Sequence, residues 1–178
     1  MHRDVSHSNV MYRTLQDGQV IGVLNDFDFA LDMDKKVEVP SSMRCIGTTP
    51  FMAIHLLSDE PPLHLYRHDL ESLFWVMIWH VHRYDNDEFR GEQALFEDWT
   101  HVSSSDLALK KRGHLSMKVT AAETYQALNP LLNIIRLVFC FGFAEESLDI
   151  PDFDHSTLGG RVTFQVFEDL FQKHRPTT

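Results

Sequence analysis

The stretch HRDVSHSN, residues 2–9, decides how the rest of this chain is interpreted. It places an acid, Asp4, and an amide, Asn9, in one short polar loop. A carboxylate can accept or orient a hydroxyl proton, and an amide oxygen can bind a hard metal ion. A short loop can aim both groups into one pocket, so the spacing predicts a site for polar chemistry. The tripeptide His-Arg-Asp alone would be weak evidence, because chance matches are common.

Two further segments follow this loop in order. Residues 10–13 and 19–24 are rich in strand-forming side chains and flank a QDG turn, which predicts a β-hairpin. The hairpin leads directly into NDFD, residues 25–28, and would fix the distance between Asn9 and Asp26. A polar turn at a strand end is the plain alternative for this tetrapeptide. The polar stretch that follows, through residues 40–42, is typical of a long loop.

From residue 68 onward the pattern is mainly helical. The segment 70–79 is apolar on nearly all sides, which predicts a buried helix over about 69–81 with carboxylates in its first turn. Further helices are expected at the following places: 93–99, Ser105 to a stop at Gly113, 121–128, Pro130 to about 141, and 164–171. We therefore predict one domain over residues 1–178, mainly α-helical, with a small β-hairpin near its N-terminus.

Composition and charge argue against several classes of function. The chain has 16 Lys and Arg against 26 Asp and Glu, giving a formal net charge of −10. Nucleic acids and anionic membranes are bound by basic patches, so neither is an expected partner. Two cysteines indicate no disulfide framework. The apolar runs are shorter than the ~20 residues of a membrane helix and no signal peptide is evident, so an intracellular protein is expected.

Taken in order, these segments resemble the C-terminal lobe of a eukaryotic-type protein kinase. HRDVSHSN matches the catalytic loop, and DFD at 26–28 stands where kinases usually carry DFG in the metal-binding loop. GTTPFMA at 47–53 is similar to the end of the activation segment, which would span about 26–55. DLESL at 69–73 resembles the start of the buried central helix in its casein-kinase-1 form. The combination is most similar to the fungal-type protein kinases over about residues 2–81.

The resemblance implies roles for five side chains. Asp4 would be the catalytic base, and Asn9 and Asp26 would hold Mg²⁺ and, through it, ATP. Arg3 often pairs with a phosphorylated activation segment in related kinases. Ser6 stands where Ser/Thr kinases place a lysine that neutralises the transferred phosphate.

The resemblance also implies structural and regulatory roles. The counterpart of Asp69 receives hydrogen bonds from the backbone of the catalytic loop. Four hydroxyls in the activation segment are candidates for regulatory phosphorylation: Ser41, Ser42, Thr48 and Thr49. The plain alternative for that region is a solvated loop without a switch.

The sequence departs from the kinase pattern in several ways. A glycine-rich loop, a strand lysine and its glutamate partner lie upstream of the catalytic loop in kinases, and none is found in these 178 residues. We therefore expect an N-lobe to be lacking and little turnover from this chain alone. Ser6 removes a cation, and Asp28 replaces a flexible glycine and adds negative charge. Residues 53–55 are Ala-Ile-His where many kinases have Ala-Pro-Glu.

Three functions are compatible with these observations. The first is the C-lobe of a kinase that transfers phosphoryl groups from ATP to protein Ser or Thr. The second is a non-catalytic pseudokinase fragment that docks a substrate or partner protein; the sequence does not give the oligomeric state. The third, a small-molecule kinase of the aminoglycoside-phosphotransferase type, usually lacks a residue like Arg3 and a segment like 47–53. For either of the first two, an exposed apolar face is expected where an ATP-binding lobe would pack.

Overall fold

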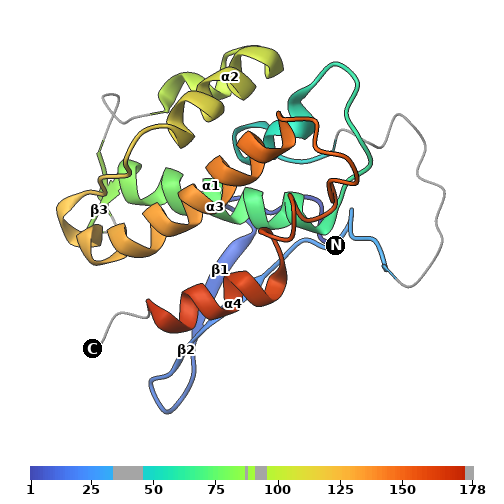
Figure 1. Cartoon of the computed structure of the whole chain (residues 1–178). Helices are drawn as coiled ribbons and strands as arrows, with labels where there is room; N and C mark the ends of the chain where they lie inside the picture. Colours follow the sequence, from blue (N-terminus) through green and yellow to red (C-terminus); the bar gives the residue numbers. More distant parts are fainter. Residues whose placement is uncertain (34–45, 87, 91–95, 175–178) are drawn as a thin grey trace.

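A long helix, α1 (Tyr66–Arg83), lies at the centre of the fold, and the other elements are arranged around it (Figure 1). The computed structural model describes residues 1–33, 46–86, 88–90 and 96–174. Its described elements are mainly helical, with a small antiparallel sheet near the N-terminus, as predicted.

Helix α1 is buried because its side chains are apolar on most faces. Phe74, Trp75 and Ile78 are each 0% exposed. The helix begins three residues before the predicted start and ends two residues after the predicted end. At its start the Nδ1 atom of His68 accepts a hydrogen bond from the backbone N–H of Leu65 at 3.0 Å. This imidazole cap satisfies a backbone donor that precedes the helix, which the sequence pattern did not reveal.

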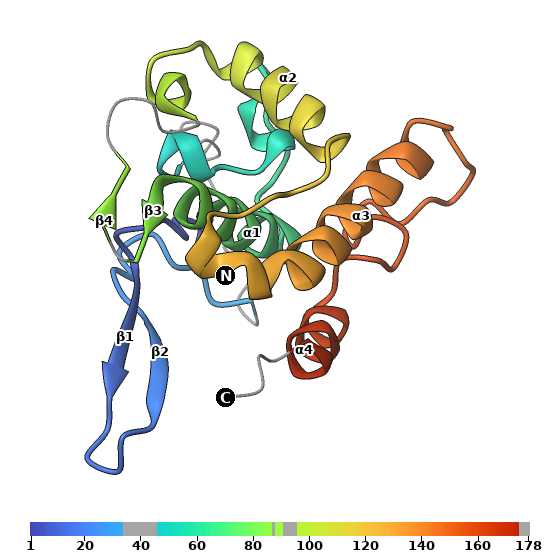
Figure 2. The same ribbon diagram turned by 90° about the vertical axis from the view of Figure 1, so that its left-hand side faces the viewer.

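The predicted β-hairpin is confirmed. Strands β1 (Val10–Thr14) and β2 (Val20–Leu24) are antiparallel, with Val10 opposite Leu24. The hairpin projects away from the helical body (Figure 2). A second, very short pair, β3 (Tyr84–Asp85) and β4 (Glu88–Phe89), follows α1 and was not predicted.

Helix α2 (Ser104–Leu115) differs from the prediction at both ends. Its cap is Ser103 rather than Ser105, because the Ser103 hydroxyl accepts the backbone N–H of Asp106 at 3.1 Å. The helix also does not stop at Gly113. It continues to Leu115, which is only 3% exposed, so packing of the last residues outweighs the low helix propensity of glycine.

The remaining helices agree with the prediction in place but not always in type. Helix α3 (Asn129–Glu146) starts one residue before the expected Pro130 and runs five residues beyond position 141, and α4 (Phe164–Lys173) is the last described helix. The segments η4 (Glu97–Thr100) and η5 (Glu123–Leu128) are 3₁₀-helices rather than α-helices. The helix predicted at 93–99 includes residues 93–95, which lie outside the described residues. Two more 3₁₀ turns, η2 (Thr49–Phe51) and η3 (Ile54–Leu57), precede α1.

One hydrophobic core joins these elements. It extends from η2 and η3 through α1 and α2 to α3 and α4, with Leu56, Leu107 and Ile135 among its fully buried members. Gly142 on α3 is part of this packing, since a Cβ added there would lie 2.9 Å from Cβ of Leu158. The helices therefore share one hydrophobic core.

The continuous segment Glu123–Glu146, which comprises η5 and α3, is by length and composition apolar enough to cross a membrane. Only 33% of its most apolar 18-residue window is buried. One such helix is weak evidence, because core helices of soluble proteins meet the same criterion. In this fold the Asn133 side chain bonds both to Val119 and to Asn129, which ties α3 to the preceding loop.

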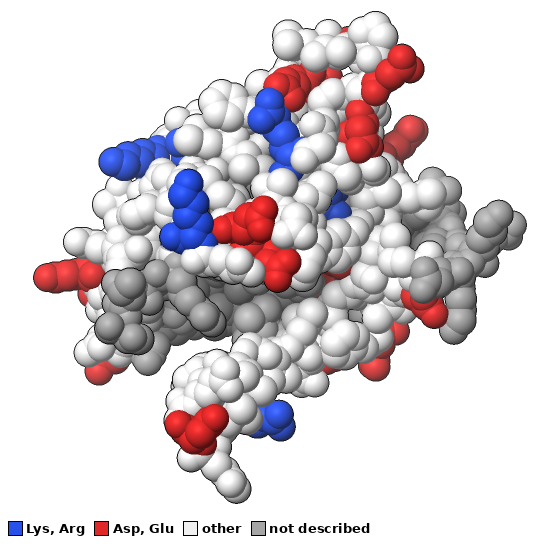
Figure 3. Space-filling model, turned by 60° about the horizontal axis from the view of Figure 1, so that its bottom comes forward, with Lys and Arg blue, Asp and Glu red and all other residues white. Residues whose placement is uncertain are grey.

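Charged side chains of both signs lie interspersed on the face shown in Figure 3, without a continuous basic patch on that face. Among the described residues, Arg161 pairs with Glu145 and Lys110 with Asp98. Exposed pairs of this kind contribute ~0–1 kcal/mol each.

Buried histidines should make the fold sensitive to acid. Burial lowers the pKa of His114 from 6.5 to about 4, helped by His82 and Arg136. Between pH 6.5 and 4 the His114 imidazole is protonated in the unfolded chain but neutral in the folded chain. The free energy of unfolding should therefore fall as pH falls through this range. His114→Phe should remove up to about 3 kcal/mol of this loss. Urea unfolding at several pH values measures it.

The matched control is His101→Phe, since His101 is exposed. An equal pH dependence of unfolding free energy in wild type and His114→Phe would contradict the assignment. Burial also lowers the pKa of His68 to about 2, so part of the acid sensitivity should persist in either variant.

Candidate catalytic site

Asp69 anchors the N-terminal loop to α1. Its Oδ2 accepts the backbone N–H of His2 at 2.7 Å, and its Oδ1 accepts that of Arg3 at 3.0 Å. The Nε2 atom of His64 adds a third bond to Oδ1 at 2.9 Å. We call these three hydrogen bonds the Asp69 anchor. They give the contact that the family resemblance implied for Asp69, and His64 is an addition that the sequence did not indicate.

The Asp69 anchor is a strong interaction because it is charged and buried. Asp69 is 7% exposed, and burial by itself would raise its pKa. The hydrogen bonds from His64, His2 and Arg3 outweigh burial and hold the pKa of Asp69 below its ordinary value. Arg3 meanwhile has a φ of 76°, a left-handed conformation that costs about 1 kcal/mol or more. The anchor therefore holds the loop in a bend that its own residues disfavour.

Asp4 and Asn9 meet inside this loop. The Nδ2 atom of Asn9 donates to the backbone oxygen of Asp4 at 3.0 Å and to its Oδ2 at 3.3 Å. Since the amide nitrogen faces Asp4, the amide oxygen of Asn9 is directed elsewhere. Asn9 is 8% exposed, so its orientation is constrained by packing as well.

The segment 25–28 is tied to the same loop by two hydrogen bonds. The backbone oxygen of Asn9 accepts the N–H of Asn25 at 2.9 Å, extending the register of the hairpin by one residue. The Nε2 atom of His2 contacts the backbone oxygen of Asn25 at 2.9 Å, and the His2 ring packs edge-on against Phe27 at 4.8 Å. Asp26, between them, is exposed and has a φ of 61°. Aspartate tolerates this left-handed conformation better than most residues.

The segment 47–53 also reaches Asp4, through Thr48. Thr48 donates to Oδ1 of Asp4 twice, through its backbone N–H at 2.7 Å and its hydroxyl at 2.8 Å. Gly47, with a φ of 137°, precedes it, and a Cβ there would lie 3.2 Å from the backbone oxygen of Arg3. Glycine is needed at this close approach. Thr49 is exposed, and Ser41 and Ser42 lie outside the described residues.

Arg3 and Ser6 are both buried in the loop that carries Asp4. Arg3 is 3% exposed, and its burial lowers its pKa against the opposing attraction of Asp69. Ser6 is 0% exposed, and its hydroxyl contacts that of Ser8 at 3.1 Å. The structure thus brings together Asp4, Asn9 and the segment around Asp26, and leaves Ser6 as a buried member of the loop turn.

The donor set suits a divalent hard cation held partly by another ligand. Among the described residues no group of three or more His, Cys, Asp and Glu side chains could hold a metal ion. An amide oxygen from Asn9 and a carboxylate from Asp26 are oxygen donors of the kind Mg²⁺ uses, with phosphates and water completing its octahedron. The residues therefore fit a metal–nucleotide complex better than a metal bound by protein alone.

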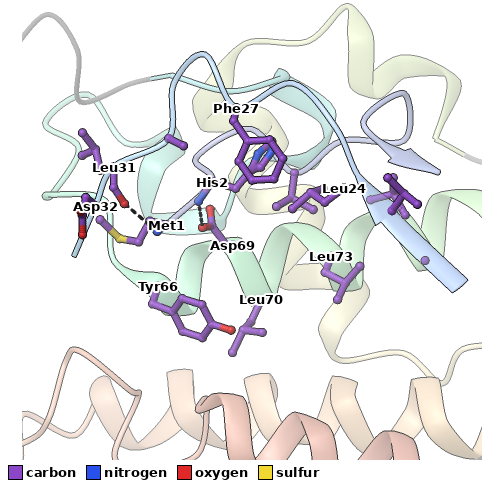
Figure 4. Close-up of a pocket in the computed structure, with 15 residues that line it drawn as sticks. Met1, His2, Leu24, Phe27, Leu31, Asp32, Tyr66, Asp69, Leu70 and Leu73 are labelled. Atoms are coloured by element: carbon purple, nitrogen blue, oxygen red, sulfur yellow. Dashed lines mark hydrogen bonds between the residues drawn. The ribbon is translucent and has the colours of Figure 1, made fainter. Parts of the chain in front are cut away.

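An apolar hollow of about 690 Å³ lies beside this site, between the hairpin and α1 (Figure 4). Leu24, Phe27 and Leu31 line it from one side, and Leu70 and Leu73 from α1. Phe27 remains 60% exposed there. This hollow is an exposed apolar surface, and its use by an ATP-binding lobe stays a prediction.

Comparison with known proteins agrees with the N-terminal motifs. The family model for fungal protein kinases matches residues 1–81. This stretch includes the loop 2–9, the hairpin, the segment 25–28 and most of α1, and over it the chain is similar to the fungal-type protein kinases. No curated protein and no solved structure matches the chain. The casein-kinase-1 character of the central helix stays a prediction.

Removing the charge of Asp69 should loosen the loop. Asp69→Asn leaves one acceptor oxygen for three donors, so the free energy of unfolding should fall by about 3 kcal/mol. Amide hydrogen exchange of residues 2–5 should also become at least tenfold faster. Asp59→Asn, at an exposed carboxylate, is the control. Unchanged exchange in Asp69→Asn would show that the loop is held by other contacts.

Proposed function

We propose that this chain is the catalytic half of a protein kinase that transfers a phosphoryl group from ATP to protein Ser or Thr when an ATP-binding half is present. The observation that carries the proposal is the placement of Asp4 and Asn9 on the anchored loop 2–9, with the Asp26 segment bonded beside it. The match of residues 1–81 to fungal protein kinases supports it.

Each side chain has a defined task in this proposal. Asp4 accepts or orients the proton of the substrate hydroxyl, and Asn9 holds the Asp4 backbone while its amide oxygen binds the metal ion. Asp26 supplies the carboxylate ligand. Mg²⁺ bound with ATP would supply the positive charge that stabilises the phosphates during transfer. Phosphoryl transfer is accelerated mainly by positioning of the reactants. The anchored loop would therefore contribute more to the rate than any nucleophilic side chain of the protein.

The bond between Thr48 and Asp4 supports an ordered substrate site. It aligns the carboxylate of Asp4 through Oδ1, while Asn9 approaches Oδ2. The segment 47–53 therefore lies directly against the proposed base, where a peptide bound to this segment would present its hydroxyl. The proposed acceptor of the phosphoryl group is therefore a Ser or Thr hydroxyl of a protein.

Magnesium-dependent nucleotide binding tests this function. ADP with Mg²⁺ should stabilise the chain by about 2.7 kcal/mol at a hundredfold excess over Kd, as measured by thermal unfolding. Asp26→Ala and Asn9→Ala should each abolish the shift. Asp28→Ala, two positions from Asp26, should keep it. Binding that is independent of Mg²⁺ or insensitive to Asp26 would contradict the proposal.

Asp4→Asn separates binding from transfer. This variant should bind Mg²⁺–ADP as the wild type does. When the chain is combined with the ATP-binding half of a fungal-type kinase, Asp4→Asn should lower peptide phosphorylation 10²–10⁴-fold, the range typical of a lost general base. Equal rates for wild type and Asp4→Asn would exclude Asp4 as the base.

A non-catalytic binding module is the second candidate, and the apolar hollow favours it. An exposed apolar surface of this kind marks a site for protein contact. The hollow should take up the ATP-binding half. Val23 and Leu31 both line it, so Val23→Lys or Leu31→Lys should prevent the complex in sedimentation experiments. Leu109→Lys is the control, since Leu109 is 68% exposed on α2, outside the hollow. A stable complex without nucleotide binding would favour this candidate over the kinase.

A further inference from the structure

The peptide groups on either side of Ala53 are held by two buried side chains of opposite charge. Lys111 on α2 donates from Nζ to the backbone oxygen of Met52. Glu71 on α1 accepts the backbone N–H of Ile54 at its Oε1, at 2.8 Å. Ala53 itself is 0% exposed. Glu71 lies in the DLESL segment at 69–73, whereas Lys111 belongs to none of the motifs found in the sequence.

Lys111 occupies an unusual place for a lysine. It is 0% exposed, and its Nζ lies 4.9 Å from the ring centroid of Trp75 and 5.3 Å from that of Trp99. Burying an ammonium group is costly unless it is paired or bound by strong acceptors. The two indole faces and the Met52 oxygen provide part of that compensation.

Glu71 supplies the opposite charge. It is 1% exposed, and its Oε1 also accepts the indole N–H of Trp75 at 3.0 Å. Its Oε2 is buried and has no hydrogen-bond partner among the described residues. A carboxylate in this position needs nearby positive charge, and Lys111 and Arg67 both attract it.

We propose that Glu71 and Lys111 form a charge clamp that positions the segment 47–54 against the carboxylate of Asp4. Thr48 holds one end of this segment on Asp4, and the charge clamp holds the other end on α1 and α2. Both are positioning residues, because neither touches the reacting groups. The role of the segment as the peptide site rests on the proposed function, whereas the clamp itself does not.

The groups around the clamp determine its response to pH. Glu71 is the charged group that faces Lys111 from α1, Trp99 faces it from η4, and His114 lies one turn further along α2. Arg67 and His55 face Glu71 from the other side. Burial lowers the pKa of Lys111 to about 7, opposed by Glu71.

The lowered pKa of Lys111 makes the folding stability depend on pH. The unfolded chain keeps the lysine proton up to its ordinary pKa of 10.5, whereas the folded chain releases it near 7. Folding stability should therefore rise as pH increases from 7 to 10.5. Lys111→Met, which fills a similar volume without charge, should lack this rise.

Tryptophan fluorescence tests the clamp directly. The wild-type emission should titrate with a midpoint near pH 7 as the ammonium beside Trp75 and Trp99 loses its proton. Lys111→Met should lose this step, and Lys110→Met at the neighbouring exposed lysine should keep it. Glu71→Gln should move the midpoint to lower pH, because the attraction that favours the ammonium is removed. His114 cannot mimic the signal, because its pKa is about 4.

Absence of a step near pH 7 in the folded wild type, which needs no variant, would overturn the proposal. A step that persists unchanged in Glu71→Gln would overturn the pairing. For positioning, Lys111→Met should raise the KM for peptide at least tenfold in the completed kinase and leave Mg²⁺–ADP binding unchanged. If the fluorescence step is present but no nucleotide binds, the clamp stands and the kinase proposal fails. A peptide KM that is unchanged in Lys111→Met would show that the clamp has no positioning role.

Discussion

The buried carboxylate of Asp69 is the constraint on which the site depends. It accepts the backbone N–H groups of His2 and Arg3 and so fixes the start of the loop 2–9 on the most buried helix of the fold. Arg3 is held at a positive φ that an unanchored loop would relax. The positions of Asp4 and Asn9, which follow within the same loop, are therefore consequences of a charged interaction made by α1.

Helix α1 serves the site twice because residues two apart in a helix point to nearly opposite faces. Asp69 binds the loop that carries the proposed base, and Glu71 binds the segment that approaches the base from the other side. Both acids are nearly inaccessible to water, where hydrogen bonds to charge are stronger and the loss of one partner is costly. This explains how a loop and an irregular segment, neither with regular secondary structure at Asp4 or Thr48, keep a defined geometry.

The sequence predicted those parts of the arrangement that have a local periodic pattern or a known motif. The hairpin, the buried α1 and the pairing of Asp4 with Asn9 could be inferred, because alternation, apolar periodicity and loop spacing are local properties. His64 and Lys111 could not be assigned in the same way, since their partners lie in other elements. Lys111 did leave one signal: it is four residues after Leu107 and three before His114, so the three share the buried face of α2.

Paramagnetic relaxation with Mn²⁺ in place of Mg²⁺ tests the central claim, that the Asp69 anchor builds a metal–nucleotide site from Asn9 and Asp26. In the presence of ADP, Mn²⁺ should broaden the amide NMR signals of Asn9 and Asp26 far more than those of the exposed Asp59. The same addition to Asp69→Asn should leave Asn9 and Asp26 sharp. Broadening that is equal in both proteins, or strongest away from the loop, would contradict the account.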